Sequence, residues 1–117
     1  MPIHTEWGNP EHTVLIEQFR DDWSWKQVAE ECKHVIHPLL ENVTYRVPWT
    51  QDMLVSHWVP TMTLLREVET MLQTPYPENI KLLVVVSGEP SVDTLVVSAY
   101  QRYGDEDCTY KAARSIK

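Results

Sequence analysis

The chain is short of cysteine, glycine and basic residues, and each shortage limits what the protein can be. Of its 117 residues two are cysteine and three are glycine, and 10 are Lys or Arg against 17 Asp or Glu. Two distant thiols without a CxxC pair make no disulfide framework, which favours a reducing compartment. The formal net charge of -7 argues against broad binding to nucleic acid or to an anionic membrane, because both require a basic surface.

Long apolar segments are also missing. No run approaches the ~20 apolar residues that cross a membrane, and the first residues lack the basic and apolar regions of a secretory signal. We therefore expect a cytoplasmic protein with no membrane span and no nucleic-acid partner. A chain of 117 residues without repeats or linkers suits one domain, residues 1–117, with a single core.

One apolar run differs from the rest of the chain. Residues Ile80–Val86 read Ile-Lys-Leu-Leu-Val-Val-Val, and a strand that is apolar on both sides is typical of the centre of a parallel sheet. The turn Ser87–Ser91 follows, and Val92–Tyr103 carries apolar residues at helical spacing. A strand, a short turn and a helix make a βα unit. Ligands and partners tend to bind at this carboxyl edge of open α/β sheets.

Turn residues and apolar spacing predict the other elements. Strands are expected at residues 3–7, 12–19, 45–49 and 108–113, a loop at 50–59, and helices at 24–39 and from 60 to 73. Ser24 and Gln27 form a capping box for the first helix, and Pro38 predicts a kink or an end near Ile36. Ser91 and Gly104 should cap the last helix. The order ββαβαβαβ indicates an α/β fold close to α+β.

Two histidines on the first helix could share a metal ion. His34 and His37 are three residues apart and close to Cys32, and histidines at this spacing on a helix can bind one metal. Cys32 belongs to the apolar stripe of the helix, whereas His34 lies off it, and no nearby Asp or His completes a ligand set. We therefore expect no metal site and interpret the histidines as surface residues beside a His-Pro step.

The turn after the apolar run has some features of an active site. Ser87 ends the strand, but its surroundings, Val-Val-Ser-Gly-Glu, do not form a G-x-S-x-G elbow. A phosphate loop would need more glycine and a lysine, and Glu89 would repel an anion that a helix N-terminus attracts. The turn therefore predicts a helix start on a docking surface that includes Ser87, Glu89 and Ser91.

Five tryptophans are many for a chain of this length, and all lie in its first half. Trp49 and Trp58 flank the expected loop. Exposed aromatic side chains there would form a contact surface. The alternative is that both belong to the core.

One scattered series of residues, taken with the order of elements, points to a family. It consists of Trp7, Asn9, Glu11, Thr13, Val14, Phe19 and Trp23-Ser24-Trp25. The series resembles the STAS family, named after sulfate transporters and anti-sigma-factor antagonists, and its looser bacterial relatives. The resemblance implies one STAS-like domain, with a mixed sheet of four or five strands and helices mainly on one side. It also implies binding to an anti-sigma-factor or kinase type of partner, without catalysis.

Regulation in the STAS family is by phosphorylation of a Ser or Thr after the third strand, in an Asp-Ser-Ser-Gly-like motif. Here Asp52 matches the acidic position and Ser56 is the nearest hydroxyl beyond it, whereas the hydroxyl pair and the glycine are absent. The resemblance thus implies Asp52 and Ser56 as a phosphorylation or docking site. The family's final helix is missing or short, so either this copy is truncated or a partner or second copy covers the sheet edge.

These observations predict a non-enzymatic regulatory or protein-binding domain that needs no cofactor. Beyond Asp52 and Ser56, its expected interaction surface includes Trp49, His57, Trp58, Ser87, Glu89 and Ser91. Two alternatives stay open. The first is a small-molecule or lipid-binding domain lined by Trp58, Met62, Met71 and Tyr100. The second is a minor serine hydrolase with Ser87 as nucleophile and His57 as base.

Overall fold

The computed structural model describes residues 2–20, 22–54, 60, 64–73 and 76–113, which build a single five-stranded sheet and the helices that cover it. The strands are β1 (Ile3–Trp7), β2 (Leu15–Phe19), β3 (Trp49–Asp52), β4 (Leu82–Val86) and β5 (Thr109–Ala112). The helices are α1 (Trp25–Glu31), the π-helical η1 (Cys32–Ile36), α2 (His37–Leu40), α3 (Leu64–Met71) and α4 (Pro90–Tyr103). The spatial order is β1-β2-β3-β4-β5.

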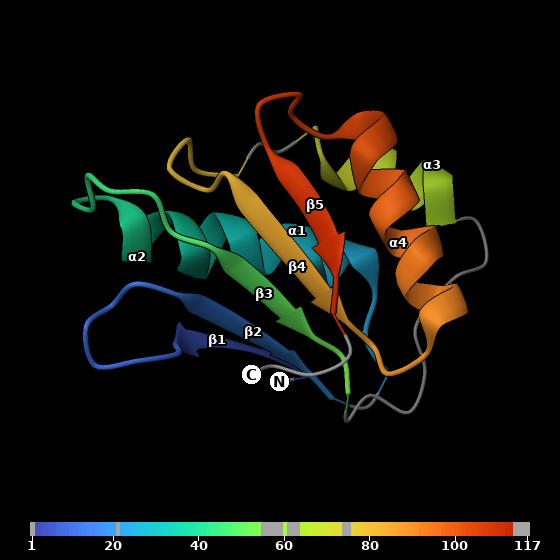
Figure 1. Ribbon diagram of the computed structural model, residues 1–117, viewed down its shortest axis with the longest axis horizontal. Coiled ribbons are helices and arrows are strands. Elements are labelled where there is room, and N and C mark those ends of the chain that lie inside the picture. The colour runs from blue at the N-terminus through green and yellow to red at the C-terminus, as the bar shows by residue number, and fades with distance from the viewer. Residues whose placement is uncertain (1, 21, 55–59, 61–63, 74–75, 114–117) are drawn as a thin grey trace.

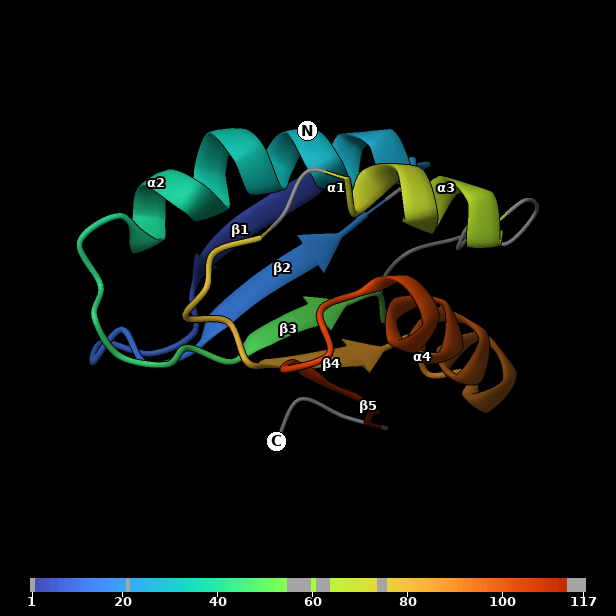
Figure 2. The same ribbon diagram turned by 90° about the horizontal axis from the view of Figure 1, so that it is seen from above.

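The sheet is mixed and its helices lie on one face. β1 and β2 are antiparallel, and the pairs β2–β3, β3–β4 and β4–β5 are parallel. Figure 1 shows the sheet in front of α1 and α2, and Figure 2 shows the helices together on one side of it. This arrangement confirms the predicted α/β fold class with a mixed sheet and one-sided helices.

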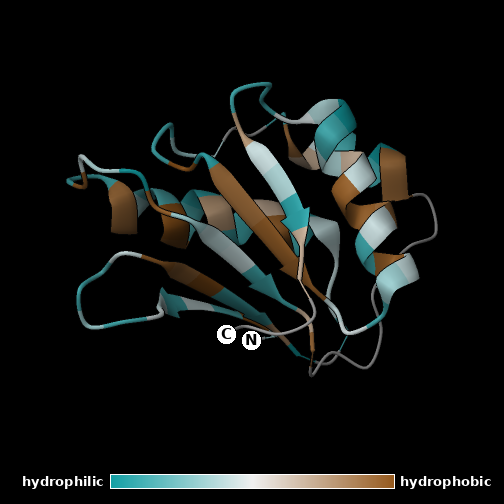
Figure 3. Ribbon diagram, viewed as in Figure 1, coloured by the Kyte–Doolittle hydropathy of each residue, from teal (hydrophilic) through white to brown (hydrophobic). Residues whose placement is uncertain are grey.

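β4 is the internal parallel strand that the apolar run predicted. Figure 3 shows it hydrophobic along its length. Leu83 and Val85 are fully buried beneath the helices, whereas Leu82 and Val84 on the opposite face are only half-buried. Alternate side chains of a strand point to opposite faces, so this apolar run faces helices on one side only.

The first helix begins as predicted but does not end as predicted. Ser24 and Gln27 form the capping box. The sequence predicted a kink or an end near Ile36, and the helix does not end there, because it continues through η1 and α2 to Leu40, which is buried. The His37 N–H donates to the Cys32 carbonyl, five residues back. This wider π-turn directly before Pro38 accommodates the proline, which has no N–H to donate.

The third strand lies later in the chain than the sequence predicted. The expected strand at 45–49 and the loop from residue 50 are wrong, since β3 begins at Trp49 and all four of its residues are buried. Tyr45 is exposed, and the Pro48 carbonyl accepts a hydrogen bond from the Leu15 N–H at 2.9 Å. The polar side chains of β3 are typical of a loop. The segment is nevertheless a strand, because it pairs with β2 on one side and with β4 on the other.

Two other element boundaries differ from the predicted ones. β2 begins at Leu15 rather than His12, since the Gly8 N–H donates to the Val14 carbonyl at 2.8 Å and closes the hairpin loop. The expected cap at Ser91 is wrong: Glu89 is the N-cap of α4 and Pro90 occupies its first turn. Proline suits that position because its missing N–H would be unpaired there in any case.

Gly104 ends α4 as predicted, and we expect its replacement by alanine to destabilise the protein. A Cβ atom at this position would lie 2.6 Å from the Tyr100 carbonyl oxygen and would also meet the Tyr110 ring. Overpacking of this kind costs about 1–3 kcal/mol. Urea unfolding of Gly104→Ala should show this loss. Adding Tyr110→Phe, which shortens the opposing side chain, should recover part of it, and strict additivity of the two losses would contradict the proposed clash.

Candidate functional site

The carboxyl ends of β3 and β4 bring together two segments that the sequence singled out. The strands are parallel, and Asp52 is the register partner of Val86. The Met53 N–H donates to the Val86 carbonyl at 2.7 Å, so the chain leaves both strands at the same point. Asp52 is buried, and its Oδ1 accepts the Leu54 N–H at 3.1 Å. Asp52 and the turn Ser87–Ser91 therefore share one edge of the sheet.

Hydrogen bonds hold the turn after β4 in a defined shape. The Ser87 hydroxyl donates to the Glu89 carbonyl and accepts the Glu89 N–H, both at 3.1 Å. The Ser87 N–H donates to Oδ1 of the buried Asp93 at 2.8 Å, which ties the turn to α4. Gly88 has a φ of 82°, a conformation that favours glycine. These contacts give Ser87 the role of a turn residue, with its hydroxyl already engaged.

Leu54 joins the turn to the end of β3. A Cβ atom placed on Gly88 would lie 3.2 Å from Leu54 Cδ2, so the two segments are in close contact. Leu54 is nevertheless 42% exposed. Glu89, Pro90 and Ser91 beside it are also exposed. We name the set of Leu54, Ser87, Gly88, Glu89 and Ser91 the carboxyl-edge surface.

Several predicted site residues lie elsewhere. Trp49 is 2% exposed, at the amino end of β3, so its assignment to an interaction surface is wrong and the alternative, that it belongs to the core, is right. Its indole Nε1–H donates to Glu17 Oε1 at 3.2 Å. Ser56, His57, Trp58 and Met62 lie outside the described residues.

The residues weighed as metal ligands separate in the structure. Cys32 is buried, and burial raises the pKa of its thiol to about 12, with a further contribution from Glu17. His34 is exposed, and its Nε2 lies 3.1 Å from Glu30 Oε2. Within the described ranges, no group of three or more His, Cys, Asp or Glu side chains could hold a metal ion.

A buried polar row crosses the centre of the sheet, and the sequence did not reveal it. Thr5 pairs with Glu17 and Glu17 with Gln51 in the strand register, so the three side chains lie in line on the helix-covered face. Gln51 Nε2 donates to Glu17 Oε1 at 3.1 Å, and the Tyr100 hydroxyl donates to Gln51 Oε1 at 3.0 Å. The row thus links β1, β2 and β3 to α4.

Glu17 is the most perturbed acid of this row. Its side chain is completely buried, and burial raises its pKa from 4.5 to about 8, with a smaller contribution from Glu31. Oε1 accepts both N–H donors, whereas Oε2 has no hydrogen-bond partner in the described part of the chain. A carboxyl group in these surroundings holds its proton at neutral pH, because the charged form is not solvated.

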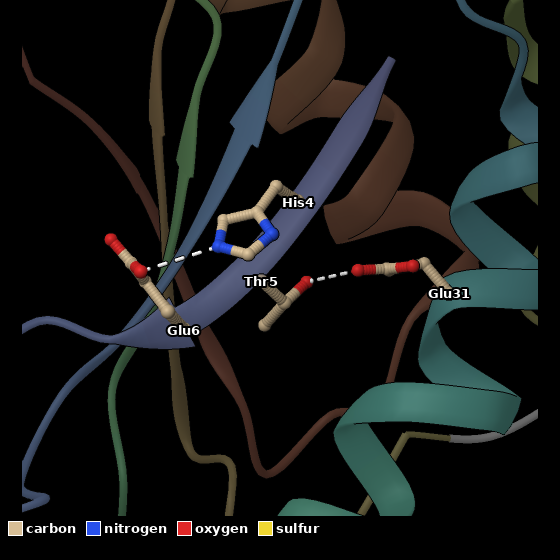
Figure 4. A network of polar contacts seen from close by, with 4 residues as sticks. All are labelled: His4, Thr5, Glu6 and Glu31. Atoms are coloured by element: carbon tan, nitrogen blue, oxygen red, sulfur yellow. Dashed lines mark hydrogen bonds and ion pairs between the residues drawn. The ribbon is translucent and has the colours of Figure 1, made fainter. Parts of the chain in front are cut away.

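A second buried carboxyl group lies next to this row. Glu31, at the end of α1, is 8% exposed, and its Oε2 accepts the Thr5 hydroxyl at 2.8 Å. Figure 4 shows Glu31 approaching β1 from the helix side, while His4 and Glu6 lie on the opposite face of the strand. One feature of the sequence indicates the buried polar row. In the alternating pattern of β2, Glu17 occupies a core-facing position between Leu15 and Phe19.

The described contacts do not assemble the two alternative sites. Ser87 bonds within its own turn, and the proposed base, His57, lies outside the described residues. Met71 lines a pocket of about 390 Å³ between α1 and α3. Tyr100 is fully buried and does not line that pocket. The hydrolase and the small-molecule domain therefore stay predictions without a built site.

Comparison with known proteins identified no relative: no family model, curated protein or solved structure matches the chain. In the part of the chain that the structure describes, no helix is long and apolar enough to cross a membrane.

Proposed function

We propose that the protein is a non-enzymatic, STAS-like regulatory domain that binds a protein partner through its carboxyl-edge surface. The observation that carries the proposal is the parallel register of β3 and β4, which joins the Asp52 end of one strand to the Ser87–Ser91 turn of the other. This edge is where open α/β sheets usually bind their ligands and partners. The mixed sheet with one-sided helices agrees with what the STAS resemblance implied.

The chemistry of the carboxyl-edge surface suits a protein partner of defined character. Leu54 is 42% exposed there, and Leu95, on α4 beyond the turn, is 52% exposed. Exposed apolar side chains rimmed by polar groups are typical of interaction sites. Glu89 supplies negative charge, and the whole chain carries a net charge of -7. The expected partner therefore presents an apolar contact with basic residues around it.

Regulation of this interaction belongs to the same proposal. Ser56 follows Asp52 by four residues and is the nearest hydroxyl to the position that STAS proteins phosphorylate. A phosphate on Ser56 would add negative charge to a chain that is already acidic and strengthen its attraction to a basic partner. Phosphopeptide mapping of protein isolated from its own cells checks this step. Complete absence of phosphate on Ser56 in all growth conditions would remove the switch but leave partner binding untouched.

A photoreactive residue at position 54 is expected to crosslink to a defined protein partner in the source cells. The matched control is the same residue at Thr109, which is exposed at the amino end of β5 and thus at the opposite end of the sheet. Excess purified wild-type protein should suppress the adduct formed at position 54. A Glu89→Lys competitor should suppress it less effectively, because the charge of the surface is reversed.

The possible adducts decide between the binding partners. A single adduct from position 54, none from position 109 and weaker competition by Glu89→Lys together support the proposal. An adduct with a second copy of the chain would indicate a homodimer in place of a separate partner. Equal adducts from both positions would show that the carboxyl edge has no special role.

A further inference from the structure

A pocket of about 290 Å³ lies beside β1, at the side of the sheet away from α4 and remote from the carboxyl-edge surface. Its walls come from the start of the chain, from α1 and from η1, and the lining residues are Pro2, Ile3, Gln27, Glu30, Glu31, His34 and Val35. We name it the β1 pocket. Among the described strands β1 pairs with β2 alone, so the pocket lies at that margin of the sheet.

The β1 pocket combines apolar walls with a buried acid. Pro2, Ile3 and Val35 provide aliphatic surface, whereas Glu31 is more than nine-tenths buried. In the described residues, the hydrogen bond that Glu31 receives comes from the neutral Thr5 hydroxyl, and no Lys, Arg or His lies within ion-pair distance of it. Among the described residues that line the pocket there is no Lys or Arg, and His34 contacts Glu30. Buried carboxylates normally have a cationic partner, and none of the described residues supplies one to Glu31.

The surroundings of Glu31 add to this deficit of positive charge. Glu31 lies close enough to the buried Glu17 to contribute to the raised pKa of that carboxyl group. Glu30 at the rim is exposed and contacts His34, not Glu31. The π-helical segment η1 begins directly after Glu31 and contributes His34 and Val35 to the wall. π-helical turns are rare and occur frequently at functional sites.

We propose that the β1 pocket binds a small organic cation, a primary ammonium group on a short aliphatic chain, whose charge pairs with Glu31. The aliphatic chain would lie against Ile3 and Val35, as apolar ligand groups do in protein pockets. The ammonium group would donate charge-assisted hydrogen bonds to the carboxylate. A bare metal ion fits less well, because Ca²⁺ and Mg²⁺ require several oxygen ligands and no group of three or more described His, Cys, Asp or Glu side chains could hold one. The site is separate from the carboxyl edge, so neither proposal depends on the other.

Titration of the labelled full-length protein with n-hexylamine, followed by amide NMR at neutral pH, tests the proposal. We expect saturable shifts at Ile3, Glu31 and Val35. Hexan-1-ol, with the same chain and no charge, cannot form the charge-assisted hydrogen bond and should bind at least about tenfold more weakly. Hexanoate should not bind. Equal affinity for the alcohol and the amine would overturn the role of Glu31.

Two variants separate the charge of the pocket from its shape. Glu31→Gln retains an oxygen that can accept the Thr5 hydroxyl but loses the charge, so hexylamine should bind about tenfold more weakly. Val35→Phe fills the pocket and should abolish binding. The matched control, Glu6→Gln, lies on the opposite face of β1 and should leave affinity unchanged (Figure 4). An unchanged affinity in Glu31→Gln, or shifts confined to other regions, would refute the proposal.

The same ammonium chemistry also occurs on lysine side chains, and a further titration distinguishes the two sources. Nα-acetyl-lysine methylamide presents the cation on a peptide backbone. Binding of n-hexylamine at least as tight as that of the capped lysine supports a free small amine. If only the capped lysine binds, the cation belongs to a protein partner and the small-amine proposal is wrong.

Discussion

Glu17→Gln is expected to become more stable than the wild type as the pH rises from about 4.5 to about 8. The folded protein raises the pKa of Glu17 from 4.5 to about 8 because the carboxyl group is completely buried. Folding therefore favours the protonated form, and the wild type loses stability as the pH rises through this window. Above the pKa of Glu17 in the folded protein, the wild type loses no further stability from this group. Glutamine is neutral at every pH and does not undergo this loss.

The size of the effect follows from the shift in pKa. Each pKa unit corresponds to about 1.4 kcal/mol, so the difference between the two proteins should grow by about 3 kcal/mol between pH 4.5 and 7. Urea unfolding at a series of pH values measures it. Other carboxyl groups titrate in both proteins and cancel in the difference. Glu11→Gln, in the exposed hairpin loop, is the matched control and should run parallel to the wild type. A Glu17→Gln curve that also runs parallel would contradict the buried, protonated carboxyl group.

Trp25→Ala is expected to cause the largest loss of stability from a single truncation. Trp25 is almost completely buried, and its ring packs edge-on against Trp23 and Tyr100 with centroid distances of 4.9 and 6.4 Å. Removing a buried Trp side chain typically costs about 3–5 kcal/mol, through lost transfer energy and the cavity left behind. Trp7→Ala is the matched control, because Trp7 is only half-buried and stacks on His12 of the hairpin loop. A loss in Trp25→Ala no larger than the control would contradict its place in the core.

Trp25→Phe separates the ring from its hydrogen bond. The indole Nε1–H donates to the Pro60 carbonyl at 2.8 Å and connects α1 to the segment between β3 and α3. Phenylalanine keeps an aromatic ring but leaves this carbonyl without its donor, which costs about 1–3 kcal/mol if the group stays buried. Thermal unfolding should place Trp25→Phe between wild type and Trp25→Ala. This variant also keeps the comparison informative if Trp25→Ala does not fold.

Local signals predicted the parts of the fold that depend on neighbours in sequence. The capping box of Ser24 and Gln27 and the helix end at Gly104 need only a few adjacent residues, and the structure confirms both. The apolar run Ile80–Val86 predicted an internal parallel strand for the same reason. A helix end near Ile36, one of the two outcomes predicted there, does not occur because a π-turn, which leaves no clear mark in the sequence, accommodates Pro38.

Sequence patterns also predicted part of the candidate site. Asp52 and the Ser87–Ser91 turn do meet at one edge, which required only that β3 and β4 be parallel. Trp49 was misplaced because β3 begins later than its alternation suggested. Gln51 was missed for the same reason, since a glutamine in an expected loop gives no sign of burial. The β1 pocket was also missed, because Glu31 on its helix resembles an ordinary surface acid.

The sequence by itself determined the order of the elements, the helix caps and the apolar strand β4, because these depend on residue types a few positions apart. Tertiary structure alone decided that Thr5, Glu17 and Gln51 form one buried row and that Glu31 lies in a pocket where no described Lys, Arg or His pairs with it. Strand register joins residues that are far apart in the chain. The protonation of Glu17 depends on how completely those distant neighbours exclude water, and no local pattern records that.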